Sequence, residues 1–136
     1  MADLLIFGAG YTGLAIARAA GQAGSSVVVT SRGSTQAQGV TVVPFDQADR
    51  WIAQATHIVS TAAPAEGGDP VLLRWGGALR GSDAVWFGYL STTGVYGDRE
   101  GGWVDEDTLP HPGSERSRRR VAAEQDWVAC AAGRER

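Results

Sequence analysis

The chain contains no lysine and no asparagine, and all 12 of its basic residues are arginine. Chemistry that needs a lysine amine from this chain is therefore excluded. Two examples are Schiff-base formation and the lysine that grips phosphate in P-loop sites.

Cysteine and histidine are also scarce. Cys130 is the single cysteine, so no internal disulfide and no cysteine-rich zinc site can form. Its alanine-rich surroundings favour a small buried side chain over a reactive thiol. His57 and His111 are the only histidines, so we expect no metal site. His111 stands between two prolines and is expected in a loop; a role in proton transfer is the open alternative.

Long hydrophobic runs are missing as well. No apolar stretch approaches the roughly 20 residues that cross a bilayer, and no charged region precedes the first apolar stretch as it would in a signal peptide. We therefore expect a cytoplasmic protein with no membrane partner. The net charge of −3 argues against general binding of nucleic acid. The length of 136 residues fits one domain, 1–136.

Short apolar runs alternate along the chain with segments of helical character. The apolar runs are typical of buried strands, and the segments between them are typical of helices. This alternation predicts an α/β fold of the Rossmann-like type, a doubly wound parallel sheet of about five strands in the order 3-2-1-4-5. The expected strands are 3–8, 26–30, 40–43, 57–61 and 84–91, the expected helices are 11–23, 47–55, 70–79 and 115–132, and 94–113 is expected as a glycine-rich acidic loop.

The segment 8–13 matches the pattern G-x-G-x-x-G, between the first expected strand and the first expected helix. In this position Gly8 permits a tight turn, Gly10 lets a pyrophosphate approach the backbone, and Gly13 allows close packing of helix on strand. Tyr11 and Thr12 complete the loop, whose free N–H groups hold phosphate at the helix N-terminus. The segment predicts a Rossmann-type site for a nicotinamide dinucleotide.

The residues after the second expected strand indicate which dinucleotide the site binds. NAD-binding sites usually carry Asp or Glu there for the ribose 2′-hydroxyl, but this chain has Ser31 and Arg32. A hydroxyl and a guanidinium suit a 2′-phosphate. NADP(H) is therefore preferred, with NAD(H) as the alternative. Asp46, after the third strand, is a candidate for contact with adenine or for capping the following helix.

Residues 89–97 read YLSTTGVYG, and an acidic, proline-containing stretch follows at 104–112. In order and spacing these segments resemble the extended short-chain dehydrogenase/reductase family, the NAD-dependent epimerase/dehydratase group, and the resemblance runs from residue 3 to about 127. It implies that Thr92 hydrogen-bonds a substrate oxygen and is the one catalytic candidate. It also implies that Tyr96 is not the proton donor, and that the turn carrying Ala62 and Ala63 contacts the cofactor.

In the family, this region is followed by the motif Tyr-x-x-x-Lys and a glutamate. Aligning Glu124 with that glutamate places Arg116 at the tyrosine position and Arg120 at the lysine position. Arginine stays protonated and cannot replace the tyrosine as acid and base. Phe7 also replaces the family's first glycine. The pattern resembles the atypical members of the family that keep the nucleotide site and lack the active tyrosine.

Two functions follow from these observations. One is an NADP(H)-binding oxidoreductase or sugar-nucleotide epimerase-like protein of atypical mechanism, with an unknown small-molecule substrate. The alternative is a non-catalytic dinucleotide-binding sensor or interaction module. The run 116–120 is expected as a solvated helix face, with contact to an anionic substrate or to cofactor phosphate as the alternative.

Members of the family also have a C-terminal substrate half, which we expect to be absent here. The outer edge of the fifth strand is then expected to be unpaired, or paired across a homodimer.

Overall fold

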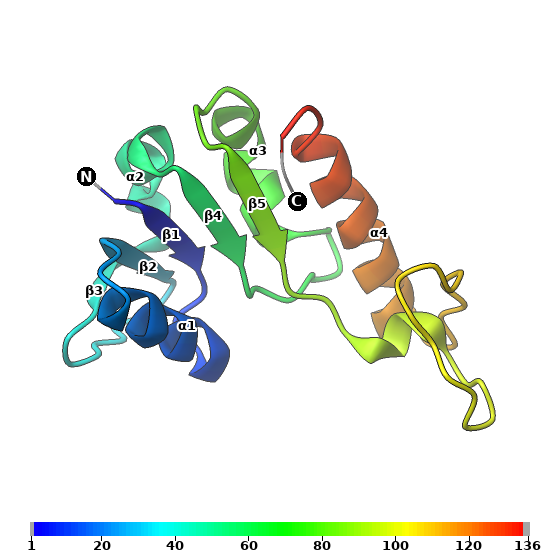
Figure 1. Ribbon diagram of the computed structural model, residues 1–136. Coiled ribbons are helices and arrows are strands. Elements are labelled where there is room, and N and C mark those ends of the chain that lie inside the picture. The colour runs from blue at the N-terminus through cyan, green and yellow to red at the C-terminus, as the bar shows by residue number, and fades with distance from the viewer. Residues whose placement is uncertain (1, 135–136) are drawn as a thin grey trace.

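The protein, described here for residues 2–134 by a computed structural model, is built on five parallel strands in one sheet (Figure 1). The sheet order β3-β2-β1-β4-β5 is the order predicted from the sequence. The apolar strands β1, β2 and β4 are mostly buried, as the central strands of a parallel sheet should be, whereas the edge strands β3 and β5 are partly exposed. The strands are β1 Leu4–Phe7, β2 Val27–Ser31, β3 Thr41–Pro44, β4 His57–Ser60 and β5 Trp86–Tyr89.

The helices cover the two faces of the sheet unequally. Helix α1 packs on β1 and β2 from one side, while α2, α3 and α4 contribute to the core on the other side (Figure 1). Two short 3-10 helices follow β3 and β5, so the expected helix 47–55 begins later and the expected loop 94–113 opens with a helical turn. The helices are α1 Tyr11–Gln22, η1 Phe45–Gln47, α2 Asp49–Gln54, α3 Pro70–Arg80, η2 Thr93–Tyr96 and α4 Glu115–Cys130.

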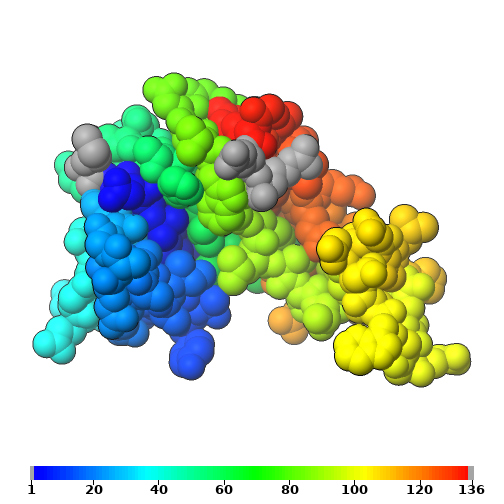
Figure 2. All heavy atoms as spheres, viewed as in Figure 1, coloured from blue at the N-terminus to red at the C-terminus, as the bar shows by residue number. Residues whose placement is uncertain are grey.

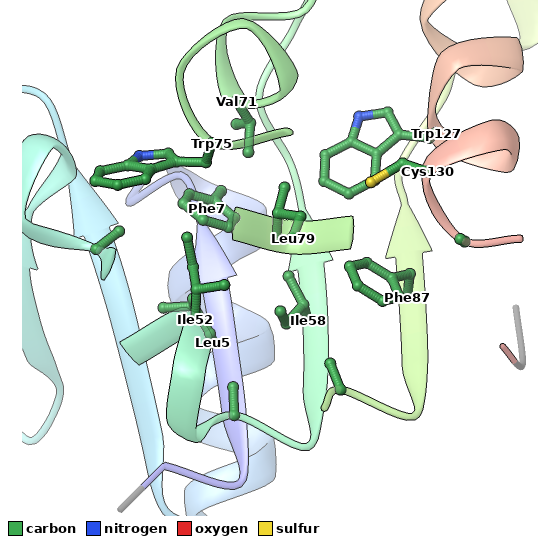
Figure 3. Packing of buried hydrophobic residues seen from close by; sticks show 14 of the residues in the cluster. Leu5, Phe7, Ile52, Ile58, Val71, Trp75, Leu79, Phe87, Trp127 and Cys130 are labelled. Atoms are coloured by element: carbon green, nitrogen blue, oxygen red, sulfur yellow. The ribbon is translucent and has the colours of Figure 1, made fainter. Parts of the chain in front are cut away.

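The main core lies between the sheet and the helices α2, α3 and α4 (Figure 3). Phe7 is fully buried there, with its ring edge-on to Phe45 at a centroid distance of 6.1 Å. Phe45 in turn meets Trp75 of α3 at 6.4 Å, and the indole Nε1 of Trp75 donates to the carbonyl oxygen of Phe45 at 3.1 Å. These contacts fix the segment after β3 against α3.

Asp69 joins α3 to α4 inside this core. It is the N-cap of α3, where its Oδ1 accepts from the amides of Val71 at 2.9 Å and Leu72 at 3.0 Å. Its Oδ2 accepts from the indole Nε1 of Trp127 at 3.1 Å. Asp69 is only 3% exposed. Burial of a carboxylate is tolerated here because these hydrogen bonds replace those to water.

Strand β5 forms the edge of the sheet opposite β3, and within residues 2–134 it pairs only with β4. On the face opposite α3, the ring of Trp86 lies over Gly88, where a Cβ atom would overlap it. His57 on β4 lies beside the same ring at a centroid distance of 6.1 Å. The large side chain of Trp86 therefore covers the β4–β5 part of the sheet face on which α1 packs over β1 and β2.

The segment after η2 extends away from the sheet as a separate projection, drawn in yellow (Figures 1 and 2). Arg99 holds it together, donating from Nε to the carbonyl of Tyr96 at 2.9 Å and from Nη2 to that of Leu109 at 2.6 Å. The amide of His111 donates to the carbonyl of Val95 at 2.9 Å, which places His111 in the loop as expected. None of the helices described between residues 2 and 134 has the length and apolar character to cross a membrane.

Candidate functional site

A cleft of about 440 Å³ opens at the carboxyl ends of β1, β2 and β4. In doubly wound sheets this is the edge at which ligands bind. The cleft lies between the glycine loop and the end of β2 on one side and the start of α3 on the other. It is lined by Phe7, Gly8, Ala9, Gly10, Thr30, Ser31, Arg32, Gly33, Thr35, Phe45, Thr61, Ala62, Ala63, Pro70 and Val71.

The glycine loop turns sharply at Gly8, whose φ of +116° is a conformation that side chains disfavour. A Cβ atom on Gly13 would overlap the carbonyl oxygen of Gly8, so this glycine lets α1 start directly against the end of β1. Thr61, just after β4, donates from its hydroxyl to the carbonyl of Phe7 at 3.1 Å. The loop is thus fixed from both neighbouring elements, in agreement with the roles expected for Gly8 and Gly13.

Helix α1 begins without a side-chain cap. Its N-cap residue is Gly10, and the first amide bonded within the helix is that of Leu14, which donates to the Gly10 carbonyl at 3.0 Å. The preceding amides of the first turn have no intrahelical acceptor. A Cβ atom on Gly10 would meet nothing within 4 Å, and Gly10 lines the cleft, so the start of the helix borders open space. An uncapped helix N-terminus facing open space can receive a phosphate group.

The end of β2 gives the cleft its charge. Ser31 accepts from the amide of Gly33 at 3.2 Å through its hydroxyl oxygen, which leaves the hydroxyl proton available to donate. Arg32 is exposed and takes part in no ion pair within the described part of the chain. No aspartate or glutamate is among the residues that line the cleft. This combination attracts an anion.

The predicted binding residues divide into two groups. The group that lines the cleft consists of Gly8, Gly10, Ser31, Arg32, Ala62 and Ala63. Tyr11, Thr12 and Gly13 form the first turn of α1 beside it, and Tyr11 is 94% exposed.

Asp46 is not among the lining residues. Its carboxylate pairs with Arg74 of α3 at 3.5 Å. The alternative that Asp46 caps α2 is wrong, because Ala48 is the N-cap of that helix and no side chain caps it. A contact of Asp46 with adenine stays a prediction.

Nine of the lining residues were not among the predicted site residues, and Thr30, Phe45 and Val71 are three of these nine. Phe45 directly follows β3, a position at the same edge of the sheet as the glycine loop, and that position is the signal that could have found it. Thr30 is 1% exposed, and its hydroxyl oxygen is a buried atom with no hydrogen-bond partner.

The second candidate region lies after β5. Thr92 is exposed and is the N-cap of η2, where its hydroxyl accepts from the amide of Gly94 at 3.4 Å. Ser114 caps α4 by accepting from the amide of Ser117 at 3.2 Å. This arrangement brings the start of α4 beside η2, but it gives Thr92 no acid or base as a hydrogen-bond partner within the described residues.

The arginines of α4 have different surroundings. Arg118 and Arg119 pair with Glu115 at 3.1 and 3.5 Å and lie on the outside of the helix. Arg120 turns inward, donating from Nη1 to the carbonyl of Leu90 at 2.8 Å and to the hydroxyl of Tyr89 at 3.3 Å. The expectation of a solvated face is therefore wrong for Arg120, because the end of β5 offers it acceptors.

Tyr89 stacks on Trp127 at a centroid distance of 5.9 Å. Burial raises the pKa of the Tyr89 phenol above its usual 10.0, and the nearby Arg120 guanidinium opposes that rise. Arg120 thus serves to attach α4 to β5.

No protein-family model matches the chain, and no curated protein matches it in sequence. Solved structures do match. A conserved protein of unknown function from Silicibacter pomeroyi DSS has 39% identity and a TM-score of 0.86 over 96% of this chain and 50% of its own. A protein from Methylobacillus flagellatus, described provisionally as an NAD-dependent epimerase/dehydratase, has 25% identity and a TM-score of 0.77 over 98% of this chain and 51% of its own.

A UDP-glucuronic acid 4-epimerase variant from Bacillus cereus, solved with a fluorinated UDP-sugar and NAD, has 19% identity and a TM-score of 0.75. The match covers 96% of this chain and 52% of the epimerase. The chain thus spans about half the length of these proteins. The predicted resemblance is confirmed: the structural neighbours with a described activity are epimerases and short-chain dehydrogenase/reductase-like proteins, and this chain has the Rossmann fold of about half of each.

Proposed function

We propose that this protein binds NADP(H) in the cleft at the carboxyl ends of β1 and β2. The observation that carries the proposal is a cleft that joins the uncapped start of α1 to Ser31 and Arg32 without a lining carboxylate. The amides at the start of α1 suit the pyrophosphate, and the Arg32 guanidinium suits a 2′-phosphate. Ala62 and Ala63, after β4, leave room on the other side for the nicotinamide half. NAD(H) is the alternative ligand.

The test is a titration with NADPH and NADH that follows tryptophan fluorescence. We expect NADPH to bind at least about tenfold more tightly, because a charge-assisted hydrogen bond contributes about 1.5–3 kcal/mol. Arg32→Ala should remove most of that preference. Arg18→Ala is the matched control, since Arg18 is an exposed arginine on α1 outside the cleft lining. Tighter binding of NADH, or a preference that Arg32→Ala leaves intact, would contradict NADP(H) as the ligand.

We propose further that this chain does not carry out the usual proton transfer of short-chain dehydrogenases. That transfer relies on a tyrosine with a neighbouring lysine, and the chain has no lysine. The Arg120 side chain, which the family alignment places at the lysine position, donates hydrogen bonds to the Leu90 carbonyl and the Tyr89 hydroxyl. A bound nicotinamide would supply hydride chemistry, while the chain itself would bind and orient it. This favours the alternative of a non-catalytic dinucleotide-binding module over an oxidoreductase or epimerase of atypical mechanism.

The two functions are separated by NADPH absorbance at 340 nm during incubation with a panel of carbonyl compounds and UDP-sugars. Tight binding without consumption supports the module. Turnover that Thr92→Ala abolishes, without a change in NADPH affinity, would support the enzyme and restore Thr92 as a catalytic residue.

We also propose that the protein is cytoplasmic and that a second copy covers the outer edge of β5, the edge that β4 does not occupy. Light scattering tests the assembly: a dimer is expected, and a stable monomer with cooperative unfolding would contradict it. The small-molecule substrate and the absence of a nucleic-acid or membrane partner remain predictions from the sequence.

A further inference from the structure

A groove of about 410 Å³ lies between strand β5 and helix α4, and it shares no lining residue with the cleft at the carboxyl ends of β1 and β2. Phe87 and Tyr89 of β5 contact the Trp127 indole of α4, with centroid distances of 6.3 and 5.9 Å. Figure 3 shows the side chains of Phe87 and Trp127 in the layer between β5 and α4. Val128, which is 47% exposed, and Ala131 also line the groove. Its surface is therefore mainly aromatic and aliphatic.

Glu124 gives this apolar groove a negative charge. Among the described residues that line it, Glu124 is the only one that is charged. Its carboxylate is half-buried and takes part in no ion pair within residues 2–134. Arg120 lies one turn earlier on α4, but its guanidinium donates to the Leu90 carbonyl and the Tyr89 hydroxyl instead. A ligand that brings a cation to Glu124 would gain a charge-assisted hydrogen bond.

The groove and the cleft therefore attract ligands of opposite charge. The cleft is lined by Arg32 and by no carboxylate, whereas the groove is lined by Glu124 and by no basic residue. Pockets of about 300–1,000 Å³ with apolar walls and few polar groups are typical of small-molecule sites, and aromatic faces also attract cations. We propose that the groove binds an aromatic ligand with a positively charged amino group, which packs its ring on Trp127 and Val128 and donates to Glu124.

Occupation of the groove has a consequence for the assembly. The groove borders the edge of β5 that a second copy is proposed to cover, so the ligand and the second copy compete for the same surface. A saturating amount of the ligand should then shift a dimer toward monomers. Binding in the groove does not require NADP(H), because the two sites share no lining residue.

The test is isothermal titration calorimetry with three compounds that share one ring system. At about pH 7, 2-naphthylmethylamine is a cation, 2-naphthalenemethanol is neutral and 2-naphthoate is an anion. The variant is Glu124→Gln, which removes the charge and keeps the shape of the side chain. Asp126→Asn is the matched control, because Asp126 is an exposed carboxylate on α4 outside the groove lining. Thermal unfolding verifies that both variants are folded.

We expect the amine to bind at least about tenfold more tightly than the alcohol, because only the amine forms a charge-assisted hydrogen bond with Glu124. The anion should show no saturable binding. Glu124→Gln should lower the affinity for the amine to that for the alcohol and leave the alcohol unchanged. Asp126→Asn should change each affinity by less than about twofold, as expected for an exposed group.

Equal affinities for the amine and the alcohol, or an amine affinity that Glu124→Gln leaves intact, would overturn the proposed contact. Light scattering on the same samples separates the remaining outcomes. A dimer that binds no amine would show that the second copy fills the groove, and a monomer that binds none would show that the groove is not a site. A monomer that binds the amine would support the groove and contradict the second copy, and none of these results bears on NADPH binding.

Discussion

Replacing Asp69 by alanine removes three hydrogen bonds from the junction between α3 and α4. The amides of Val71 and Leu72 lose their cap, and the Trp127 indole loses its acceptor. Loss of an aspartate cap costs about 1 kcal/mol, and a buried donor left without an acceptor costs about 1–3 kcal/mol. We therefore expect Asp69→Ala to lower the free energy of unfolding by about 2–4 kcal/mol.

The assay is urea and thermal unfolding followed by far-ultraviolet circular dichroism, which does not depend on the tryptophans. A loss of this size lowers the unfolding midpoint by on the order of 10 °C in a domain of this length. Asp126→Ala, at an exposed site on α4, is the control and should stay within about 0.5 kcal/mol of the wild type.

A double-mutant cycle separates the cap from the indole contact. Asp69→Asn can keep an oxygen toward the cap amides, but its amino group then faces the Trp127 indole, so one donor meets another. Its cost should be smaller by about 1 kcal/mol in a Trp127→Phe background, where that donor is gone. A cost below about 1 kcal/mol for Asp69→Ala, or equal costs of Asp69→Asn in both backgrounds, would refute the reasoning.

Three further predictions follow from the described contacts. Gly13→Ala should destabilise the protein by about 1–3 kcal/mol and abolish NADPH binding, because the added Cβ would overlap the Gly8 carbonyl oxygen. Urea unfolding measures the loss of stability and a titration with NADPH measures binding. Normal NADPH binding by this variant would contradict the prediction. Because the pKa of Tyr89 is raised in the folded protein, the unfolded chain loses the phenol proton at a lower pH. The free energy of unfolding should therefore fall as pH rises through and above 10.0. In urea unfolding, this fall with pH should be smaller for Tyr89→Phe than for the wild type. Burial raises the pKa of the Cys130 thiol, so native protein should react with iodoacetamide far more slowly than protein in urea, and equal rates would contradict burial.

The fold could be predicted because its signals are local. The glycines at 8, 10 and 13 stand between a β-branched or apolar run and a helical segment, and each later strand is short, apolar and followed by a turn. Right-handed crossovers then leave one strand order. The start of the second predicted helix was placed too early because Phe45, rather than continuing into α2, turns back in a 3-10 turn to contact Phe7 and Trp75.

The site was predicted only in the parts that lie on the glycine loop and at the tips of strands. Thr30 was not among the predicted site residues, and that its buried hydroxyl has no partner can be known only once every neighbour is placed in three dimensions. The inward turn of Arg120 was missed for a related reason: its acceptors, Tyr89 and Leu90, lie about 30 positions earlier in the chain. Local pattern identifies a charged helix face but does not tell which of its members a distant strand will bind.

The outer edge of β5 affects how the protein will behave at high concentration. An edge strand offers a row of backbone donors and acceptors to any other extended chain, and many proteins protect such edges with lysine or proline. This chain has no lysine, and β5 contains no proline. The small size of the strand limits this edge instead, since β5 has only four residues. A foreign strand can therefore form only a few backbone hydrogen bonds with this edge, and lengthening β5 by extended residues should lower the concentration at which the protein aggregates.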